Sequence, residues 1–500
     1  MSTMTDFING QCRRAFVLGK PGTGKSYKLF NEIIPAFLEA QPGKEIAILA
    51  FTNKAMGVIA DYAAQFGYAD HPLIHITTIH KFAGLRPALN ESATRTKDLH
   101  LTQSSGECNE AWLVVIDEVG TVGEELGTAM DNAYYDENRF EQMLFMGDYQ
   151  QLKPIEGEAY YTPAKGDPVE YLDKIRRTDC KDVGAVITEL HDLILDGSPR
   201  RYKLRPSENI IKGMPKGAER DALTVIAWRN RAVQDHNANL MGRTLPEPGD
   251  ELYCDTLKET LICTDVLDLL DLPYTDLQRI TPAQHDRYGS KLAKNDPNSY
   301  KMNDETDRFN TRQRFVNQIK PRIDNEGTAS GRIKLLELTT DQEEVFNCVA
   351  VFGVADHRET MAALLETALC ANRDLLAEYG LKEEKETTSR RRKVKPVTDR
   401  NGKTWVNLKA FIDNETDCTP RDHWNDAIKE YKAAWGTYAT AKEILFCADF
   451  NRARTCHSLQ GSSLPVVYID TADFNGCRDV DAVNRLLYVG VSRSRGKVYF

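Results

Sequence analysis

Short runs of apolar residues recur along the first third of the chain, and each run ends in a cluster of polar residues. Residues 15–18, 111–116 and 143–146 are such runs. Four to six apolar residues without alternation are typical of a parallel strand that is buried on both faces. Residues 27–38, after the first run, instead carry apolar residues at helical spacing. The pattern therefore predicts an α/β fold in which parallel strands alternate with helices.

The first apolar run leads into a glycine-rich turn that spans residues 19–26, with the sequence GKPGTGKS. Between a strand and a helix, this pattern is typical of a loop that binds phosphate through backbone N–H groups and a helix N-terminus. We expect Lys25 to reach the β- and γ-phosphates of a nucleotide, and Ser26 to hold Mg²⁺. A glycine turn without a chemical role is the alternative. The predicted nucleotide-binding residues are Gly22, Thr23, Gly24, Lys25 and Ser26.

Two carboxylates and a glutamine follow the next two apolar runs. Asp117 and Glu118 come directly after residues 111–116. Asp117 is expected to bind Mg²⁺, and Glu118 to polarise an attacking water molecule. Gln151, after residues 143–146, is the candidate sensor of a γ-phosphate, because an amide can donate to phosphate and accept from water. Taken alone, an acidic pair is most often an ordinary strand end, and the glutamine segment an ordinary turn.

Composition narrows the class of protein. The chain has 500 residues, of which 41% are apolar and 28% charged, as in a globular protein of two to four domains. No apolar run is long enough to span a bilayer, and we expect a cytoplasmic protein of a bacterial or phage-infected cell. The eleven cysteines include no Cys-x-x-Cys pair, which argues against a zinc module or a disulfide framework. A net charge of −10 argues against a wholly basic surface but leaves room for a local basic groove.

Further segments, in an unchanged order along the chain, resemble the motifs of superfamily 1 helicases. These segments are residues 48–55, 77–82, 455–462 and 487–495. The sequences IDEVGTV and GDYQQLKP also resemble those of superfamily 1B, the branch of the RecD and phage Dda helicases, and we expect a phage-type member. The adenine-contacting glutamine of the family has only a poor counterpart in Gln11, so the sequence leaves adenine specificity open.

The resemblance implies a fold and an activity. The expected fold is α/β, with two RecA-like parallel-sheet P-loop domains and a large mixed α+β insertion in the second. ATP and Mg²⁺ are the expected cofactors, with ATP hydrolysed between the two domains. The expected activity is translocation along single-stranded DNA from 5′ to 3′ with unwinding of the duplex. An RNA helicase, a translocase or DNA-dependent ATPase that does not unwind, and a nucleotide-gated binding module are the alternatives.

The resemblance also assigns roles to residues near the two ends of the chain. Arg493, expected to follow a strand, would reach from the second domain to the γ-phosphate. Arg176 is the candidate for a second arginine, with the adjacent Arg177 as the alternative, and Gly461 is placed at the nucleotide. Residues expected to contact single-stranded DNA are Thr52, Asn53, Thr78, His80, Lys81, Phe82, Trp228, Asn230, His457 and Ser458. Expected partners are single-stranded DNA, duplex junctions and replication or recombination proteins, with no membrane and a monomeric enzyme.

The sequence predicts three regions. Residues 1–190 form the first RecA-like domain, with a hairpin or loop insertion at about 83–110. Residues 191–245 and 441–500 form the second, and residues 246–440 form the accessory insertion, part of it SH3-like. Within this insertion we expect a strand at 251–254, helices at 360–379 and 424–435, and a solvated charged loop at 382–395. A phosphate contact is the alternative for that loop.

Overall fold

The computed structural model of the chain describes residues 3–87, 101–103, 111–135, 140–154, 157–254, 259–267, 333–339, 345–385, 387–389, 392–416 and 424–500. The chain divides into two compact units. The first unit combines residues 1–85, 104–240 and 452–500, and the second combines residues 86–103 and 241–451. Among the described residues, no helix is both long enough and apolar enough to cross a membrane.

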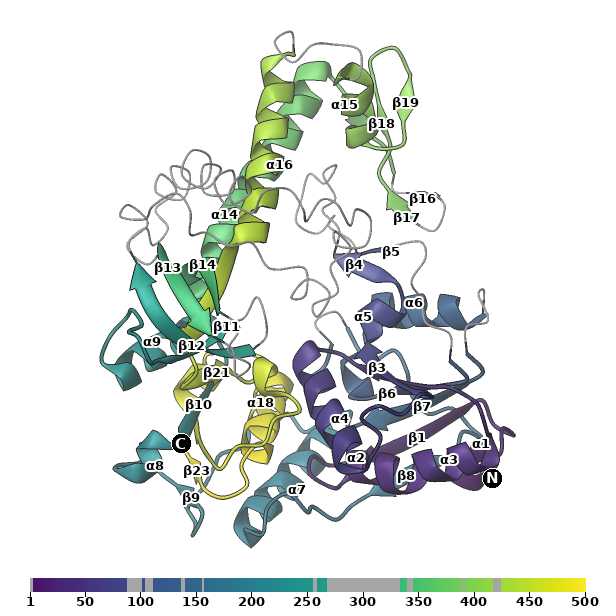
Figure 1. The fold of residues 1–500 in the computed structure, drawn as a ribbon, viewed down its shortest axis with the longest axis vertical. Coiled ribbons are helices and arrows are strands. Elements are labelled where there is room, and N and C mark those ends of the chain that lie inside the picture. The colour runs from purple at the N-terminus through teal and green to yellow at the C-terminus, as the bar shows by residue number, and fades with distance from the viewer. Residues whose placement is uncertain are drawn as a thin grey trace. The chain divides into compact units, whose positions relative to one another are not determined.

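The first unit contains a six-stranded sheet in the order β3-β2-β6-β7-β1-β8, in which all neighbouring strands are parallel (Figure 1). Apolar side chains of its strands pack against the helices that connect them, and they form one buried core. The six strands of this sheet are β1 (Arg14–Gly19), β2 (Ile46–Ala50), β3 (Ile74–Thr78), β6 (Leu113–Ile116), β7 (Gln142–Gly147) and β8 (Val169–Leu172). Three of them, β1, β6 and β7, confirm the strands predicted from the apolar runs.

Helices connect several of these parallel strands along the chain. The helix predicted after the phosphate loop is confirmed, and it includes one π-helical turn at Leu29–Ile33 between α2 and α3. Threonine side chains cap the N-termini of α4 and α5, where each accepts a hydrogen bond from a backbone N–H of the first helical turn. The helices are α1 (Met4–Ile8), α2 (Lys25–Lys28), α3 (Ile34–Ala40), α4 (Asn53–Gln65), α5 (Ile79–Phe82) and α6 (Glu124–Tyr135).

A second parallel sheet of the first unit has the order β21-β10-β22-β23-β9. Its strands are β9 (Ile210–Ile211), β10 (Leu223–Ala227), β21 (Ala453–Thr455), β22 (Val466–Ile469) and β23 (Val498–Tyr499). Because these strands come from both sides of residues 241–451, the long insertion interrupts this sheet and not the first. The predicted fold class is thereby confirmed. The helices of this part are α7 (Lys181–Leu195), α8 (Ala218–Asp221), α9 (Asn230–Met241), α17 (Thr471–Asn475) and α18 (Val480–Ser492).

The second unit is built on a closed barrel of five strands. Four neighbouring pairs are antiparallel, and β14 and β20 are parallel. The helices between β14 and β20 have an apolar core of their own, separate from that of the barrel. The barrel strands are β11 (Glu251–Cys254), β12 (Glu259–Leu267), β13 (Ile333–Thr339), β14 (Val345–Phe352) and β20 (Leu445–Phe450).

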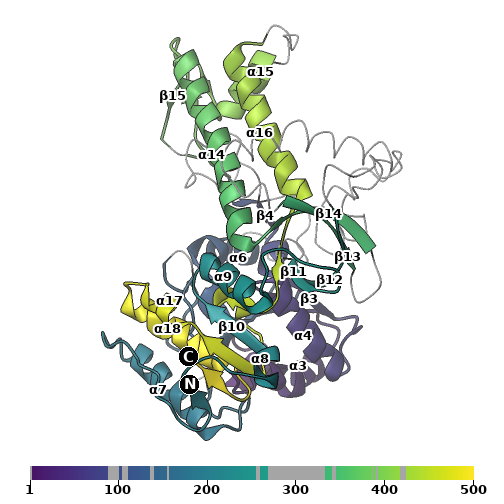
Figure 2. The same ribbon diagram turned by 90° about the vertical axis from the view of Figure 1, so that its left-hand side faces the viewer.

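The two long helices of the second unit lie side by side (Figure 2). They are α14 (Val354–Tyr379) and α16 (Asp426–Ile444), with α15 (Leu408–Thr416) between them in the chain. The indole N–H of Trp435 donates to the side-chain oxygen of Asn372 at 2.7 Å, which joins α16 to α14 inside their core. The predicted end of the first helix at Gly380 is confirmed, since this residue caps α14 at φ 62°.

One expectation for the insertion is wrong. The charged segment at 382–395 does not form a loop throughout, because β16 (Thr387–Ser389) pairs antiparallel with β17 (Arg392–Val394). Threonine and valine at the ends of these strands favour extended backbone, and this preference outweighs the charge pattern. In the predicted insertion at 83–110, β4 (Leu85–Pro87) pairs with β5 (Leu101–Gln103), and the rest lies outside the described residues.

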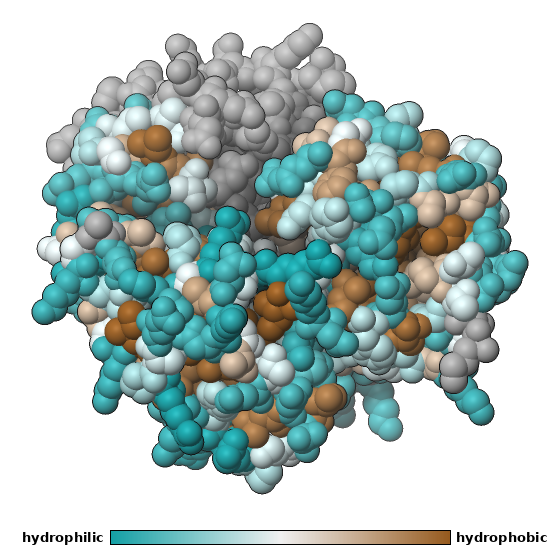
Figure 3. Space-filling model, turned by 90° about the horizontal axis from the view of Figure 1, so that it is seen from below, coloured by the Kyte–Doolittle hydropathy of each residue, from teal (hydrophilic) through white to brown (hydrophobic). Residues whose placement is uncertain are grey.

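Figure 3 shows one face of the molecule coloured by hydropathy. Among the described residues of this face, hydrophobic side chains lie in small groups that are separated by hydrophilic ones. Scattered apolar side chains of this kind are normal on a protein surface and indicate no binding area by themselves. The polar clusters of the sequence lie instead at the ends of β1, β6 and β7, and these strand ends form the candidate site.

Candidate nucleotide site

The phosphate loop connects β1 to α2 and is shaped by a glycine that no other residue could replace without strain. Gly22 has φ +76°, and a Cβ atom built there would lie 2.5 Å from the Cβ of Arg177. The Lys25 ammonium donates to the carbonyl oxygens of Gly19 at 2.6 Å and Lys20 at 3.2 Å. The Thr23 hydroxyl donates to the same Lys20 oxygen at 2.8 Å. The loop therefore curls around its own lysine, with the start of a helix behind it, as phosphate binding requires.

Asp117 and Glu118 follow β6, two strands away from β1 in the sheet order. Burial at the strand end and the charge of Glu118 raise the pKa of Asp117 to about 7, although the Lys25 ammonium opposes this shift. The Asp117 carboxylate accepts a hydrogen bond from the N–H of Glu118 at 3.0 Å. Glu118 is itself in the left-handed region at φ 54°. The backbone of Glu118 therefore leaves the extended conformation of β6 directly after the strand ends.

The segment after β7 packs closely on the segment after β6. A Cβ atom on Gly147 would lie 2.9 Å from the backbone nitrogen of Val119. This approach brings Gln151, whose side chain is buried, to Glu118: its amide nitrogen lies 3.4 Å from a Glu118 carboxylate oxygen. Parallel neighbouring strands end at the same edge of a sheet, so β6, β7 and β1 place their chemical groups together.

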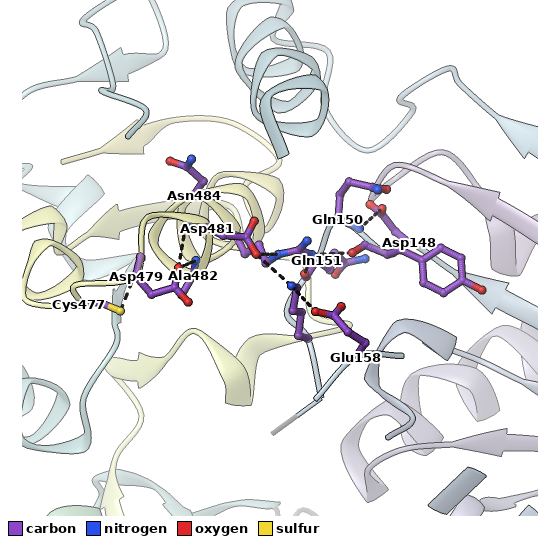
Figure 4. A network of polar contacts seen from close by, with 12 residues as sticks. Asp148, Gln150, Gln151, Glu158, Cys477, Asp479, Asp481, Ala482 and Asn484 are labelled. Carbon is purple, nitrogen blue, oxygen red and sulfur yellow. Dashed lines mark hydrogen bonds and ion pairs between the residues drawn. The ribbon is translucent and has the colours of Figure 1, made fainter. Parts of the chain in front are cut away.

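Helix α18 faces the segment after β7 from the side of the second sheet (Figure 4). The Tyr488 hydroxyl donates to Asp148 at 2.6 Å. One guanidinium nitrogen of Arg485 donates to the carbonyl oxygens of Tyr149 at 2.6 Å and Gln151 at 2.7 Å. The sequence analysis did not identify Arg485 as a site residue, because it expected a strand, and not a helix, before Arg493. Its spacing of three residues from Tyr488 on a helix would have indicated a shared face.

Arg493 follows α18 and not the expected strand, and its side chain is only 1% exposed. Its guanidinium donates to the Gln151 amide oxygen at 3.1 Å and to the Val489 carbonyl at 3.2 Å. Burial lowers the pKa of Arg493, and the charge of Glu118 works against this effect. Glu118, Gln151 and Arg493 thus form one chain of polar contacts that joins loops of the two sheets.

The two candidate arginines after β8 lie differently. The backbone N–H of Arg176 donates to the Gly22 carbonyl at 2.7 Å, and its side chain is exposed. The Arg177 guanidinium instead donates to the Ser492 carbonyl at 3.0 Å. Burial, with the nearby charge of Arg493, lowers the pKa of Arg177 to about 10. The structure therefore brings Arg177 into the polar cluster. Arg177 is the residue that the sequence analysis gives as the alternative to Arg176.

The candidate metal ligands and Gly461 flank this cluster. Ser26 lies in the first turn of α2, and Asp117 lies at the end of β6. A hydroxyl and a carboxylate oxygen form a donor set that suits Mg²⁺, which is usually held by one or two carboxylates together with phosphate oxygens. Gly461 has φ +79°, and the next residue, Ser462, accepts a hydrogen bond from Arg493 at 3.5 Å.

The DNA-contact candidates of the first sheet follow β2 and β3. Thr52 and Thr78 cap helices: their hydroxyls accept from the N–H groups of Ala55 at 3.1 Å and Lys81 at 3.3 Å. Burial lowers the pKa of His80, whose ring lies edge-on to Phe51 at 5.6 Å between centroids. Lys81 is exposed, and Asn53 is the first residue of α4, with its side chain outside the described part.

Phe82 was expected to contact DNA, and the structure contradicts this expectation. Its side chain is 1% exposed, and its ring packs against Phe140 with 5.9 Å between centroids. A ring that is enclosed in this way offers no face on which a base could stack. The apolar character of Phe82 in the sequence therefore reflects its burial against Phe140.

The DNA-contact candidates of the second sheet follow β10 and β21, which are parallel neighbours. The Asp473 carboxylate accepts from the backbone N–H of Trp228 at 2.7 Å and fixes the turn into α9, which begins at Asn230. His457 is exposed, and the Ser458 hydroxyl donates to a carbonyl at 2.9 Å in the turn after β21. The structure therefore gathers these four residues at one edge of the sheet.

Comparisons with known proteins match both ends of the chain. The family model of an AAA domain matches residues 9–156, and the model of the UvrD-like helicase C-terminal domain matches residues 451–500. No curated protein matches the sequence.

Among solved structures, Bacteroides Pif1 bound to ssDNA is 14% identical, with a TM-score of 0.45 over 99% of this chain and 91% of that one. The Pif1 helicase from Candida albicans is 16% identical, with a TM-score of 0.40 over 100% of this chain and 94% of that one. The two family matches fall on the two parallel sheets, in the order in which the helicase motifs occur. The chain is therefore similar to an AAA domain over residues 9–156 and to the C-terminal domain of UvrD-like helicases over residues 451–500.

Proposed function

We propose that this chain is an ATP-dependent DNA helicase of superfamily 1B, which hydrolyses ATP between the two parallel sheets of the first unit and moves along single-stranded DNA from 5′ to 3′. The observation that supports the proposal best is the chain of contacts from Glu118 through Gln151 to Arg493. A nucleotide on the phosphate loop would have carboxylates of one sheet and a guanidinium of the other within one cluster. Such an arrangement links hydrolysis to movement between the sheets.

Each residue of the loop has a role that follows from its chemistry. The backbone N–H groups of Gly22, Thr23 and Gly24 would bind the phosphates, and Lys25 would exchange its carbonyl partners for phosphate oxygens. Ser26 and Asp117 would hold Mg²⁺, which, when bound, neutralises phosphate charge. Burial raises the pKa of Asp117, and a bound Mg²⁺ would oppose this effect by favouring the carboxylate form that can act as its ligand.

Glu118 and Arg493 would act on the reacting groups. The Glu118 carboxylate would orient the attacking water and accept its proton, since a carboxylate can act as a general base when it is in hydrogen-bond reach. Arg493 would stabilise the charge of the transferring phosphoryl group, a contribution of about 10³–10⁵ in rate for arginines of this kind. Gln151 contacts both residues, so the presence of a γ-phosphate would change its hydrogen bonds. We propose Arg177 as the second arginine, with Arg176 as the alternative.

Single-stranded DNA would follow the edges at which β2, β3, β10 and β21 end. Exposed cationic and polar side chains there suit phosphate contacts, and Trp228 is the remaining candidate for base stacking. As the nucleotide state changes, the two sheets would hold the strand alternately. We propose the three regions that the sequence predicts, with the five-stranded barrel as the accessory, SH3-like part of the insertion. Because β20 is a barrel strand, the insertion would extend over residues 241–451 and not end at residue 440. Gly461 would lie beside the nucleotide.

The experiment that tests this function compares unwinding of DNA and RNA duplexes that carry a single-stranded tail at either the 5′ or the 3′ end. We expect ATP-dependent unwinding of the 5′-tailed DNA duplex alone. Unwinding from a 3′ tail would refute the polarity, and preference for RNA would favour the RNA-helicase alternative. Multiple turnover of ATP without strand separation would favour a translocase, and nucleotide binding without turnover would favour a gated binding module.

A further inference from the structure

Arg485 makes a set of buried contacts that the proposed roles leave unused. It lies in the second turn of α18 and is 9% exposed. One of its terminal nitrogens donates to the carbonyl oxygens of Tyr149 at 2.6 Å and Gln151 at 2.7 Å. The two carbonyls belong to residues on either side of one position in the loop that follows β7. A single guanidinium nitrogen therefore fixes the backbone on both sides of Gln150.

Arg485 is itself held in place. Its Nε donates to the carboxylate of Asp481, one helical turn earlier, at 2.9 Å. The Asp481 carboxylate, labelled in Figure 4, also lies 3.4 Å from the ammonium of Lys153, which belongs to the segment after β7. The planar guanidinium is thus oriented by one carboxylate while it binds two carbonyls, a geometry that an ammonium reproduces only in part. One face of α18 therefore binds both the backbone and a side chain of the loop.

The loop determines where the Gln151 amide points. Its nitrogen is directed at Glu118 at 3.4 Å, and its oxygen accepts from Arg493 at 3.1 Å. Both contacts depend on the position of the Gln151 backbone, whose carbonyl is one of the two acceptors of Arg485. Displacement of a reacting geometry by about 1 Å can cost on the order of 10² in rate. A shift of this backbone would therefore separate Glu118 from Arg493.

We propose that Arg485 is a positioning residue for Gln151: through two backbone carbonyls, α18 of the second sheet holds the glutamine between Glu118 and Arg493. The inference rests on the proposed function, since it assigns the coupling between the sheets to a particular side chain. In this arrangement a movement of α18 carries the Gln151 backbone with it. Hydrolysis then occurs only when the second sheet is in place.

The test measures steady-state ATP hydrolysis and nucleotide affinity for Arg485→Gln in the full chain with single-stranded DNA. We expect kcat to fall by about 10²-fold, because the Gln151 backbone loses its anchor. The dissociation constant of a non-hydrolysable ATP analogue should change by less than about threefold, because the phosphate loop is intact. Arg485→Lys should restore part of kcat, since an ammonium can still donate to one or both carbonyls.

A second measurement separates positioning from general stabilisation. The affinity for an oligo-dT strand should differ between the ADP and ATP-analogue states of the wild type, and this difference should be lost in Arg485→Gln. The matched control is Arg201→Gln, because Arg201 also donates to two backbone carbonyls, of Asn475 at 3.3 Å and Cys477 at 2.8 Å, away from the loop. This control should lower the unfolding temperature without removing the difference in DNA affinity.

Two outcomes would overturn the inference. The first is an unchanged kcat in a folded Arg485→Gln variant. The second is a control variant, Arg201→Gln, that loses as much kcat and DNA affinity as Arg485→Gln does. A failure of the proposed function would be recognised separately, because the wild type would then show no DNA-stimulated turnover and no unwinding. A wild type that unwinds DNA beside an unaffected Arg485→Gln variant would remove the role of Arg485 alone.

Discussion

Replacement of Arg493 by glutamine isolates the guanidinium that the second sheet contributes to the candidate site. The side chain is 1% exposed and donates to the Gln151 amide oxygen, to the Ser492 hydroxyl and to the carbonyl oxygens of Val489 and Ser462. Glutamine keeps an N–H donor that can satisfy one of these acceptors, but it removes the positive charge. The variant therefore tests charge more than packing.

The expected losses in rate and in stability differ in size. Loss of a transition-state arginine lowers the hydrolysis rate by about 10³-fold at least, which corresponds to about 4 kcal/mol at the barrier. Three of the four hydrogen bonds are lost; the one to Ser462 is long at 3.5 Å and contributes little, and the other two contribute about 1 kcal/mol each. Burial lowers the pKa of Arg493, so the removal of this buried charge offsets part of that loss. We expect the free energy of unfolding to fall by less than about 2 kcal/mol.

The assay combines three measurements on the full chain: multiple-turnover hydrolysis with single-stranded DNA, affinity for a non-hydrolysable ATP analogue, and unfolding in denaturant. Arg495→Gln is the matched control, because Arg495 lies two residues later and is exposed. We expect a loss of turnover with nucleotide affinity nearly unchanged in Arg493→Gln, and a small effect in the control. Equal losses of affinity and turnover, or equal effects in both variants, would refute a role of Arg493 in the chemical step.

Three further substitutions give distinct outcomes. Lys25→Ala should abolish DNA-stimulated ATP hydrolysis while DNA binding, measured by fluorescence anisotropy, is retained; continued turnover would contradict the phosphate-loop assignment. Gly22→Ala should weaken nucleotide binding and lower the unfolding free energy by about 1–3 kcal/mol, because φ is +76° and the new Cβ would meet that of Arg177 at 2.5 Å. Partial burial alone would raise the pKa of Asp182, but hydrogen bonds from Ser207 and Asn209 outweigh it and lower this pKa to about 2. Asp182→Ala should therefore lower the free energy of unfolding in denaturant by about 2–3 kcal/mol at pH 7. The difference in unfolding free energy between variant and wild type should shrink as the pH falls below the ordinary pKa of 3.8, and it should disappear near pH 2. A difference that does not depend on pH would contradict this prediction.

The first sheet could be predicted from the sequence because its signals are local. The run before Gly19 and the run before Asp117 are short, apolar without interruption and followed by turn residues, as is typical of a strand buried on both faces. The phosphate loop follows from glycines at fixed spacing, which serve one backbone conformation. The end of α14 was predicted for the same reason, since Gly380 adopts a conformation that other residues avoid.

The contacts between the two sheets of the first unit could not be predicted in the same way. Arg485 contacts residues that precede it by more than three hundred positions, and no local pattern encodes such a contact. The apolar run around Tyr488 fits a strand as well as a buried helix, and the helix is what forms. Phe82 shows the opposite error: a motif position suggested contact with DNA, whereas the tertiary fold encloses the ring.

Glu118 illustrates a compromise between durability and catalysis. Among the described residues it is the only one other than glycine with a positive φ, a backbone state that costs non-glycine residues on the order of 1 kcal/mol. A glycine at this position would relax the backbone but would also remove the carboxylate to which the proposed function assigns the role of general base. Selection for higher stability should therefore favour a substitution that the proposed mechanism predicts to be inactive. Thermal tolerance and enzymatic competence therefore oppose each other at this single position.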